Sequence, residues 1–121
     1  MKKILVVDDS PTIRVNAKYL IKNIGYEVAE AENGEEALKI LDNDDISLIL
    51  LDIHMPVMNG MEMLKEMEGV EKYQDIPIFI ISTDDAEERM AAAEKFGVKG
   101  WLYKPFKNKD IQTIMELYLE D

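Results

Sequence analysis

Six polar side chains of this sequence follow directly after short apolar runs. They are Asp8, Asp9, Asp52, Ser82, Thr83 and Lys104. Three of the six are carboxylates, which repel one another when crowded, so at least one should have a raised pKa if no counter-charge is present. A bound divalent cation would remove this conflict, and a small set of hard oxygen ligands suits Mg²⁺ better than a Ca²⁺ cage. The side chains predict a magnesium site if folding brings them together.

A carboxylate, a hydroxyl and a lysine beside Mg²⁺ are typical of phosphoryl transfer. Asp52 can act as a nucleophile and form an acyl phosphate. The metal and Lys104 would neutralise charge on the phosphoryl oxygens, and a hydroxyl could donate a hydrogen bond to a third oxygen. Zn²⁺ is disfavoured because it prefers His or Cys ligands, and the sequence holds one His and no Cys.

Apolar runs alternate with amphipathic stretches along the chain, which predicts a sheet covered by helices. Strands are expected at residues 4–7, 26–31, 46–51, 76–81 and 101–103. Helices are expected at residues 11–24, 35–41, 61–67, 86–96 and 107–119. This alternation implies an α/β fold with a doubly wound parallel sheet and helices on both faces. Because ligands of such sheets bind beyond the carboxyl ends of the strands, the six polar side chains are expected at one functional edge.

Local signals mark where several elements begin and end. Ser10 and Pro11 are typical of a helix start, and Gly25 is typical of a helix end. Residues 54–60 are rich in helix and strand breakers and are expected to form a loop. Residues 26–31 alternate in polarity, which indicates a strand near an edge of the sheet.

Composition excludes several classes of protein. Among 121 residues, 14 are Lys or Arg and 25 are Asp or Glu, so the net charge of −11 argues against direct binding to nucleic acid. Hydrophobic residues make up 47% of the chain, and no linker interrupts it, so residues 1–121 are expected to form one domain. The apolar runs are too short to cross a bilayer and do not form a secretory signal, which predicts a cytoplasmic protein without membrane insertion.

The sequence resembles the receiver domain of two-component response regulators, of the CheY-like, single-domain kind. The resemblance covers the whole chain and rests on residues 6–10, 51–60, 76–82 and 103–106. Because several separate motifs occur in the right order, the match is more specific than any one of them. The resemblance implies a flavodoxin-like fold with five parallel strands in the order 2-1-3-4-5.

The resemblance also implies roles for the acidic residues. Asp52 resembles the phosphoacceptor, and Asp8 and Asp9 resemble the acidic pair that holds Mg²⁺ together with it. The backbone carbonyl of His54 stands where the family supplies a further metal ligand. The His54 side chain itself is expected to be a solvated loop residue.

Other matched positions imply a switch. Ser82 stands where the family keeps its switch Ser or Thr, and Thr83, one residue later, is the weaker candidate. Lys104 matches a lysine that is followed by a cis-proline, here Pro105. Trp101 occupies the position of the switch aromatic, which is usually Tyr or Phe.

The implied function is phosphorelay signalling. A histidine kinase or a phosphotransfer protein would phosphorylate Asp52, and Ser82 and Trp101 would then change the binding of a downstream protein target. His54 and Asp84 match positions that flank the hydrolytic water and would tune the lifetime of the phosphorylated state. Such a domain is a monomer or a weak dimer and catalyses only its own phosphorylation and dephosphorylation.

Two other functions fit the sequence less well. A phosphohydrolase with an aspartyl nucleophile often carries a second Asp two positions later as general acid, where this chain has His54. A phosphate-independent adaptor would be marked by loss of an acidic pair member, of Asp52 or of Lys104, and none of these is lost.

Overall fold

The computed structural model describes residues 2–83 and 87–119. In these residues five parallel strands form one sheet in the order β2-β1-β3-β4-β5. The strands are β1 (Lys3–Val7), β2 (Glu27–Ala31), β3 (Leu48–Asp52), β4 (Ile78–Ser82) and β5 (Gly100–Tyr103). The helices are α1 (Pro11–Ile24), α2 (Gly34–Asn43), α3 (Gly60–Met67), α4 (Glu87–Glu94) and α5 (Asn108–Tyr118), with a 3₁₀ turn, η1 (Glu71–Tyr73). The α/β class and the expected strand order are confirmed.

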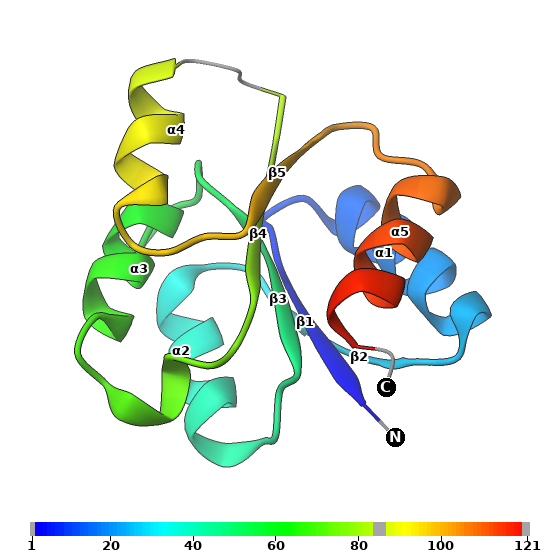
Figure 1. Cartoon of the computed structure of the whole chain (residues 1–121), viewed down its shortest axis with the longest axis horizontal. Helices are drawn as coiled ribbons and strands as arrows, with labels where there is room; N and C mark the ends of the chain where they lie inside the picture. The colour runs from blue at the N-terminus through cyan, green and yellow to red at the C-terminus, as the bar shows by residue number, and fades with distance from the viewer. Residues whose placement is uncertain (1, 84–86, 120–121) are drawn as a thin grey trace.

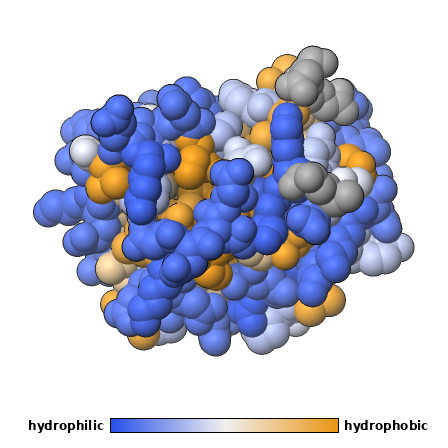
Figure 2. Space-filling model, turned by 90° about the horizontal axis from the view of Figure 1, so that it is seen from below, coloured by the Kyte–Doolittle hydropathy of each residue, from blue (hydrophilic) through white to orange (hydrophobic). Residues whose placement is uncertain are grey.

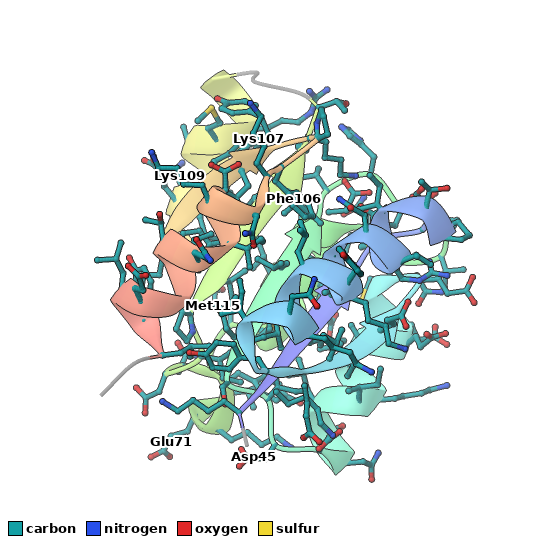
Figure 3. All side chains as sticks on the ribbon, turned by 90° about the vertical axis from the view of Figure 1, so that its right-hand side faces the viewer. Asp45, Glu71, Phe106, Lys107, Lys109 and Met115 are labelled. Atoms are coloured by element: carbon teal, nitrogen blue, oxygen red, sulfur yellow. The ribbon has the colours of Figure 1, made fainter. Side chains whose placement is uncertain are left out.

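Helices cover both faces of the sheet, with α1 and α5 on one side and α2, α3 and α4 on the other (Figure 1). Alternate residues of β1 serve the two cores: Leu5 packs toward α2 and α3, and Ile4 packs toward α1 and α5. Phe106, which precedes α5, and Met115, which is part of α5, belong to the second core and are labelled in Figure 3. Because the central strands are buried on both faces, they read as continuous apolar runs in the sequence.

Capping sets the ends of α1 where the sequence predicts them. The hydroxyl of Ser10 accepts a hydrogen bond from the N–H of Ile13, and Pro11 is the first helical residue. Gly25 ends the helix in a left-handed conformation with a φ of 108°. A residue with a side chain would be strained there, so glycine is the fitting residue.

Other boundaries differ from the sequence prediction. The strand expected at 76–81 begins at Ile78, because Pro77 has no N–H for the ladder and contributes only its carbonyl, which accepts from the N–H of Ile49. Asp52 and Ser82, expected just after their strands, are instead the last residues of β3 and β4. The η1 turn was not expected.

Figure 2 shows the edge of the molecule at which the strands begin, and most of its surface is hydrophilic. A hollow of about 390 Å³ lies between α3, η1 and the α4–β5 connection. None of the six polar side chains lines this hollow. None of the described helices combines the length and the apolar character that a bilayer crossing needs.

Candidate acidic site at the carboxyl edge of the sheet

The carboxyl ends of β1, β3 and β5 bring three charged residues together. Val7 of β1 is paired with Leu51 of β3, so the next residues, Asp8 and Asp52, are neighbours across the sheet. Lys104 follows β5, and its N–H donates to the carbonyl of Ser82 at 2.9 Å. The strand register therefore places side chains from distant parts of the sequence at one edge.

The three predicted carboxylates meet at this edge. One carboxylate oxygen each from Asp8, Asp9 and Asp52 lies within 4.8 Å of the others. Asp8 and Asp52 are buried, whereas Asp9 is exposed to solvent. Oδ2 of Asp8 is fully enclosed and receives no hydrogen bond of normal geometry, which is unusual for a buried oxygen. Three clustered carboxylates with hard oxygen atoms fit a divalent cation such as Mg²⁺.

Lys104 supplies the positive charge nearest to the carboxylates. Its Nζ atom lies 2.6 Å from Oδ2 of Asp8 and 3.4 Å from Oδ1 of Asp52, and its side chain is only 12% exposed. Burial, followed by the negative charge of Asp8, raises the pKa of Asp52, although Lys104 and the N–H of His54 act in the opposite direction. The pKa of one carboxyl is thus raised even with a counter-charge present, and burial contributes more to this than the crowding of the carboxylates.

Hydrogen bonds to its backbone and to Oδ1 hold Asp8 in place. Its N–H donates to the carbonyl of Ala31 at 3.0 Å, and its Oδ1 accepts from the N–H of Ser10 at 2.9 Å. Its carbonyl accepts from Nη1 of Arg14 at 2.6 Å. Sequence reasoning missed Arg14, although a cation six residues after an expected acidic ligand, in the first turns of a helix, is a signal that could have found it.

The loop between β3 and α3 is anchored at two glycines. The N–H of Gly60 donates to the carbonyl of Ile53 at 2.9 Å, and the N–H of Gly34 donates to the carbonyl of Met58 at 2.8 Å. A Cβ atom on Gly60 would lie 2.4 Å from the backbone oxygen of Asp52, closer than real contacts allow. Glycine at position 60 therefore permits the close approach of α3 to the end of β3.

The same loop contains a tight turn at Val57. Its φ is 67°, and the N–H of Met58 donates to the carbonyl of Pro56 across it at 2.7 Å. A positive φ is strained for a β-branched residue. The Val57 side chain is 74% exposed, so packing offsets little of this strain. His54 lies in the same loop with an exposed side chain, and its N–H donates to the Asp52 carboxylate.

The structure separates the two hydroxyl candidates by burial. Ser82 is buried at the end of β4, one position beyond Ile81, which is paired with Asp52. Thr83 follows it and is exposed. Asp84 lies outside the described residues. Ser82 is thus the hydroxyl-bearing residue next to Asp52 across the sheet.

Trp101 and Pro105 lie on either side of the predicted lysine. Trp101 is half-buried on β5, beside Ile80 of β4, and packs against the core that faces α2 and α3. The peptide bond between Lys104 and Pro105 is cis, as the resemblance implies.

Comparisons with known proteins give one consistent result. A sequence model of the response regulator receiver domain matches residues 4–116. A chemotaxis protein CheY homolog of Campylobacter jejuni is 37% identical over 116 residues, which cover 94% of this chain and 89% of that protein. Chemotaxis protein CheY1 of Helicobacter pylori is 38% identical over 119 residues, which cover 97% of this chain and 96% of its own. The solved structure of Vibrio cholerae chemotaxis protein CheY4 has a TM-score of 0.91 at 34% identity, with 98% of this chain and 99% of that chain covered.

Proposed function

Because the chain belongs to the response regulator receiver domain family, we propose that Asp52 accepts a phosphoryl group from a histidine kinase or a phosphotransfer protein. The chain is a CheY-like receiver, and its class of activity is phosphoaccepting signalling rather than turnover of an external substrate. The proposal includes the roles of individual residues, of the metal and of the partners.

The arrangement of Asp8, Asp9, Asp52 and Lys104 is the observation that carries the proposal. An Asp52 carboxylate oxygen attacks phosphorus, a new O–P bond forms, and the bond between phosphorus and the donor's leaving atom breaks with its electron pair. The Lys104 ammonium, 3.4 Å from Oδ1 of Asp52, is close enough to neutralise charge on a phosphoryl oxygen. Because this ammonium is largely buried, water screens its charge little.

Mg²⁺ fits the remaining oxygen atoms. The side chains of Asp8, Asp9 and Asp52 and the backbone carbonyl of His54 would hold it, and the bound ion supplies positive charge beside the phosphoryl oxygens. Asp9 is the exposed member of the three, so it offers the solvent-facing ligand. Asp8 is fixed by its backbone contacts, and its Oδ2 atom can bind the ion where the Lys104 ammonium gives way.

The switch in this proposal runs through Ser82 and Trp101. The buried Ser82 hydroxyl would donate to a phosphoryl oxygen on Asp52, and the half-buried Trp101 would repack when β4 shifts. Thr83 is the secondary hydroxyl candidate. His54 and Asp84 would tune the lifetime of the phosphorylated state from their loop positions.

We also propose the cellular setting of the domain. Residues 1–121 form a single receiver domain in the cytoplasm, without membrane insertion, as a monomer or weak dimer. The output is a change in binding to a downstream protein, and the net charge of −11 disfavours direct contact with nucleic acid.

Intact-mass measurement after incubation with acetyl phosphate and Mg²⁺ tests the proposal. The expected result is one added phosphoryl group, lost in Asp52→Asn and on chelation of the metal with EDTA. Asp42→Asn is the matched control, because it neutralises an exposed carboxylate on α2 that lies outside the acidic site. No added mass would favour a phosphate-independent adaptor, and steady release of phosphate from a generic ester would favour a phosphohydrolase.

A further inference from the structure

Arg14 of α1 connects the acidic site to the edge strand β2. Its Nη1 atom donates to the Asp8 carbonyl at 2.6 Å, and its Nε atom lies 3.4 Å from Oε1 of Glu30. Nζ of Lys18, one turn later on α1, lies 3.6 Å from the other carboxylate oxygen of Glu30. Only 15% of the Arg14 side chain is exposed, so its guanidinium is held between helix and strand.

The Asp8 carbonyl that Arg14 contacts belongs to the peptide unit between Asp8 and Asp9. Since Asp8 is fully buried, its carbonyl needs a partner, and Arg14 provides one where the β1 ladder has ended. The N–H on the other side of Asp8 is held by the carbonyl of Ala31. Without Arg14, the peptide plane would be free to turn, and the exposed Asp9 would turn with it.

Glu30 balances the charge of Arg14 locally. Arg14 therefore affects the carboxylates mainly by fixing their orientation and less by its charge. A cation near the site would by itself oppose the binding of a second cation. Loss of this charge alone would therefore strengthen the binding of Mg²⁺. Loss of a positioning contact would instead weaken Mg²⁺ binding. A charge role and a positioning role for Arg14 therefore predict opposite changes in Mg²⁺ affinity.

We infer that Arg14 is a positioning residue that orients the Asp8–Asp9 peptide for Mg²⁺, with Glu30 as its anchor on β2. The inference rests on the proposed function, because it requires the acidic site to bind a divalent cation. Residues that hydrogen-bond to metal ligands and orient them commonly lower metal affinity by ten- to a hundredfold when they are removed.

Calorimetric titration with Mg²⁺ tests the inference on the whole chain. Arg14→Met is expected to weaken binding by about tenfold or more. Lys18→Met is the matched control, because it removes the same charge beside Glu30 and leaves the Asp8 carbonyl contact intact. This control is expected to bind Mg²⁺ within about twofold of the unmodified protein, or slightly more tightly.

The ¹⁵N and ¹H resonances of the Asp9 amide provide a second measurement, made without metal. These resonances report on the Asp8–Asp9 peptide. Their chemical shifts are expected to change in Arg14→Met but not in Lys18→Met. Arg14→Lys keeps the charge but cannot reproduce the two-sided contact of the guanidinium. It should give intermediate Mg²⁺ affinity, and it serves as the test variant if Arg14→Met does not fold.

Two results would overturn the inference in distinguishable ways. A folded Arg14→Met protein with unchanged Mg²⁺ affinity and an unchanged Asp9 amide would remove Arg14 as a positioning residue and leave the proposed function standing. If Arg14→Met does not fold, the same two unchanged readouts in Arg14→Lys would have that meaning. Failure of the unmodified protein to bind Mg²⁺, or unchanged binding in Asp9→Asn, would overturn the metal site and the inference with it.

Discussion

Nζ of Lys104 lies closer to Oδ2 of Asp8, at 2.6 Å, than to Oδ1 of Asp52, at 3.4 Å. The lysine is therefore paired more tightly with a candidate metal ligand than with the candidate phosphoacceptor. A cation that binds to Asp8 must compete with this ammonium for the same buried oxygen, which gives opposite expectations for metal binding and for phosphorylation.

Replacement of Lys104 by Met should separate these two properties. Mg²⁺ binding should become severalfold tighter because a competing positive charge is gone. Phosphorylation of Asp52 by acetyl phosphate should slow by about tenfold or more, because charge on the phosphoryl group is no longer neutralised. Calorimetry and time-resolved intact-mass measurement test the two effects. The exposed Lys107→Met variant is the control, and weaker Mg²⁺ binding in Lys104→Met would contradict the expectation.

Asp52→Asn should make the metal-free protein more stable at neutral pH. Burial and Asp8 raise the pKa of Asp52, so the folded state holds its proton more tightly than the unfolded state does. The contribution of the Asp52 carboxyl to the free energy of unfolding is fully present below the unfolded pKa of about 3.9. This contribution declines as the pH rises toward the folded pKa and stays low above the folded pKa. Removal of the charge should therefore raise the free energy of unfolding at pH 7.

Urea unfolding of both proteins in EDTA, from pH 3 to pH 7, measures this difference. The two curves should converge at the acidic end, where Asp52 is protonated in both states. A less stable Asp52→Asn protein at pH 7 would show that the Asp52 carboxylate is stabilised by its surroundings, contrary to the direction of its pKa.

Gly60→Ala should destabilise the protein through a direct clash. The added Cβ atom would lie 2.4 Å from the backbone oxygen of Asp52, so either α3 or the end of β3 must move. The expected loss in free energy of unfolding is about 2 kcal/mol or more. Gly69→Ala is a suitable comparison, because Gly69 has a φ of 79° but no atom within 4 Å of an added Cβ. It should lose only about 1 kcal/mol from backbone strain.

Val57→Asn should stabilise the protein, although it replaces an apolar residue by a polar one. Val57 is 74% exposed and has a φ of 67°, a conformation that Asn adopts more easily than a β-branched residue. The expected gain is about 1 kcal/mol in thermal or urea unfolding. A loss of stability would mean that the Val57 side chain makes a contact that outweighs the backbone strain.

The sequence is sufficient to predict the architecture and most of the site, because both depend on strong local patterns. Buried parallel strands appear as apolar runs, and the residues that end them must meet at one edge, which is how Asp8, Asp52 and Lys104 were found. The cis bond before Pro105 followed from the resemblance. Asp84, by contrast, falls outside the described residues and stays a prediction.

The features that were missed depend on how far side chains reach across the fold. The spacing of Arg14 from Asp8 marks it as a candidate, but its contact with the Asp8 carbonyl depends on the packing of α1 beside β2, which the spacing alone does not fix. The two distances from Nζ of Lys104, to Asp8 and to Asp52, likewise differ by less than an ångström, and periodicity does not encode such a difference. The η1 turn is too short to have a periodic signal.

The acidic site draws on β1, β3 and β5, which follow one another only after intervening helices and strands. The candidate metal ligands lie at the ends of β1 and β3, which are neighbours in the sheet but are separated in the sequence by α1, β2 and α2, so an ion binds to them together only when the fold has formed. Its affinity is consequently linked to global unfolding, so that the midpoint of denaturation should rise with the concentration of Mg²⁺. Ligand dependence of the unfolding transition thus reports whether β1 and β3 are assembled side by side.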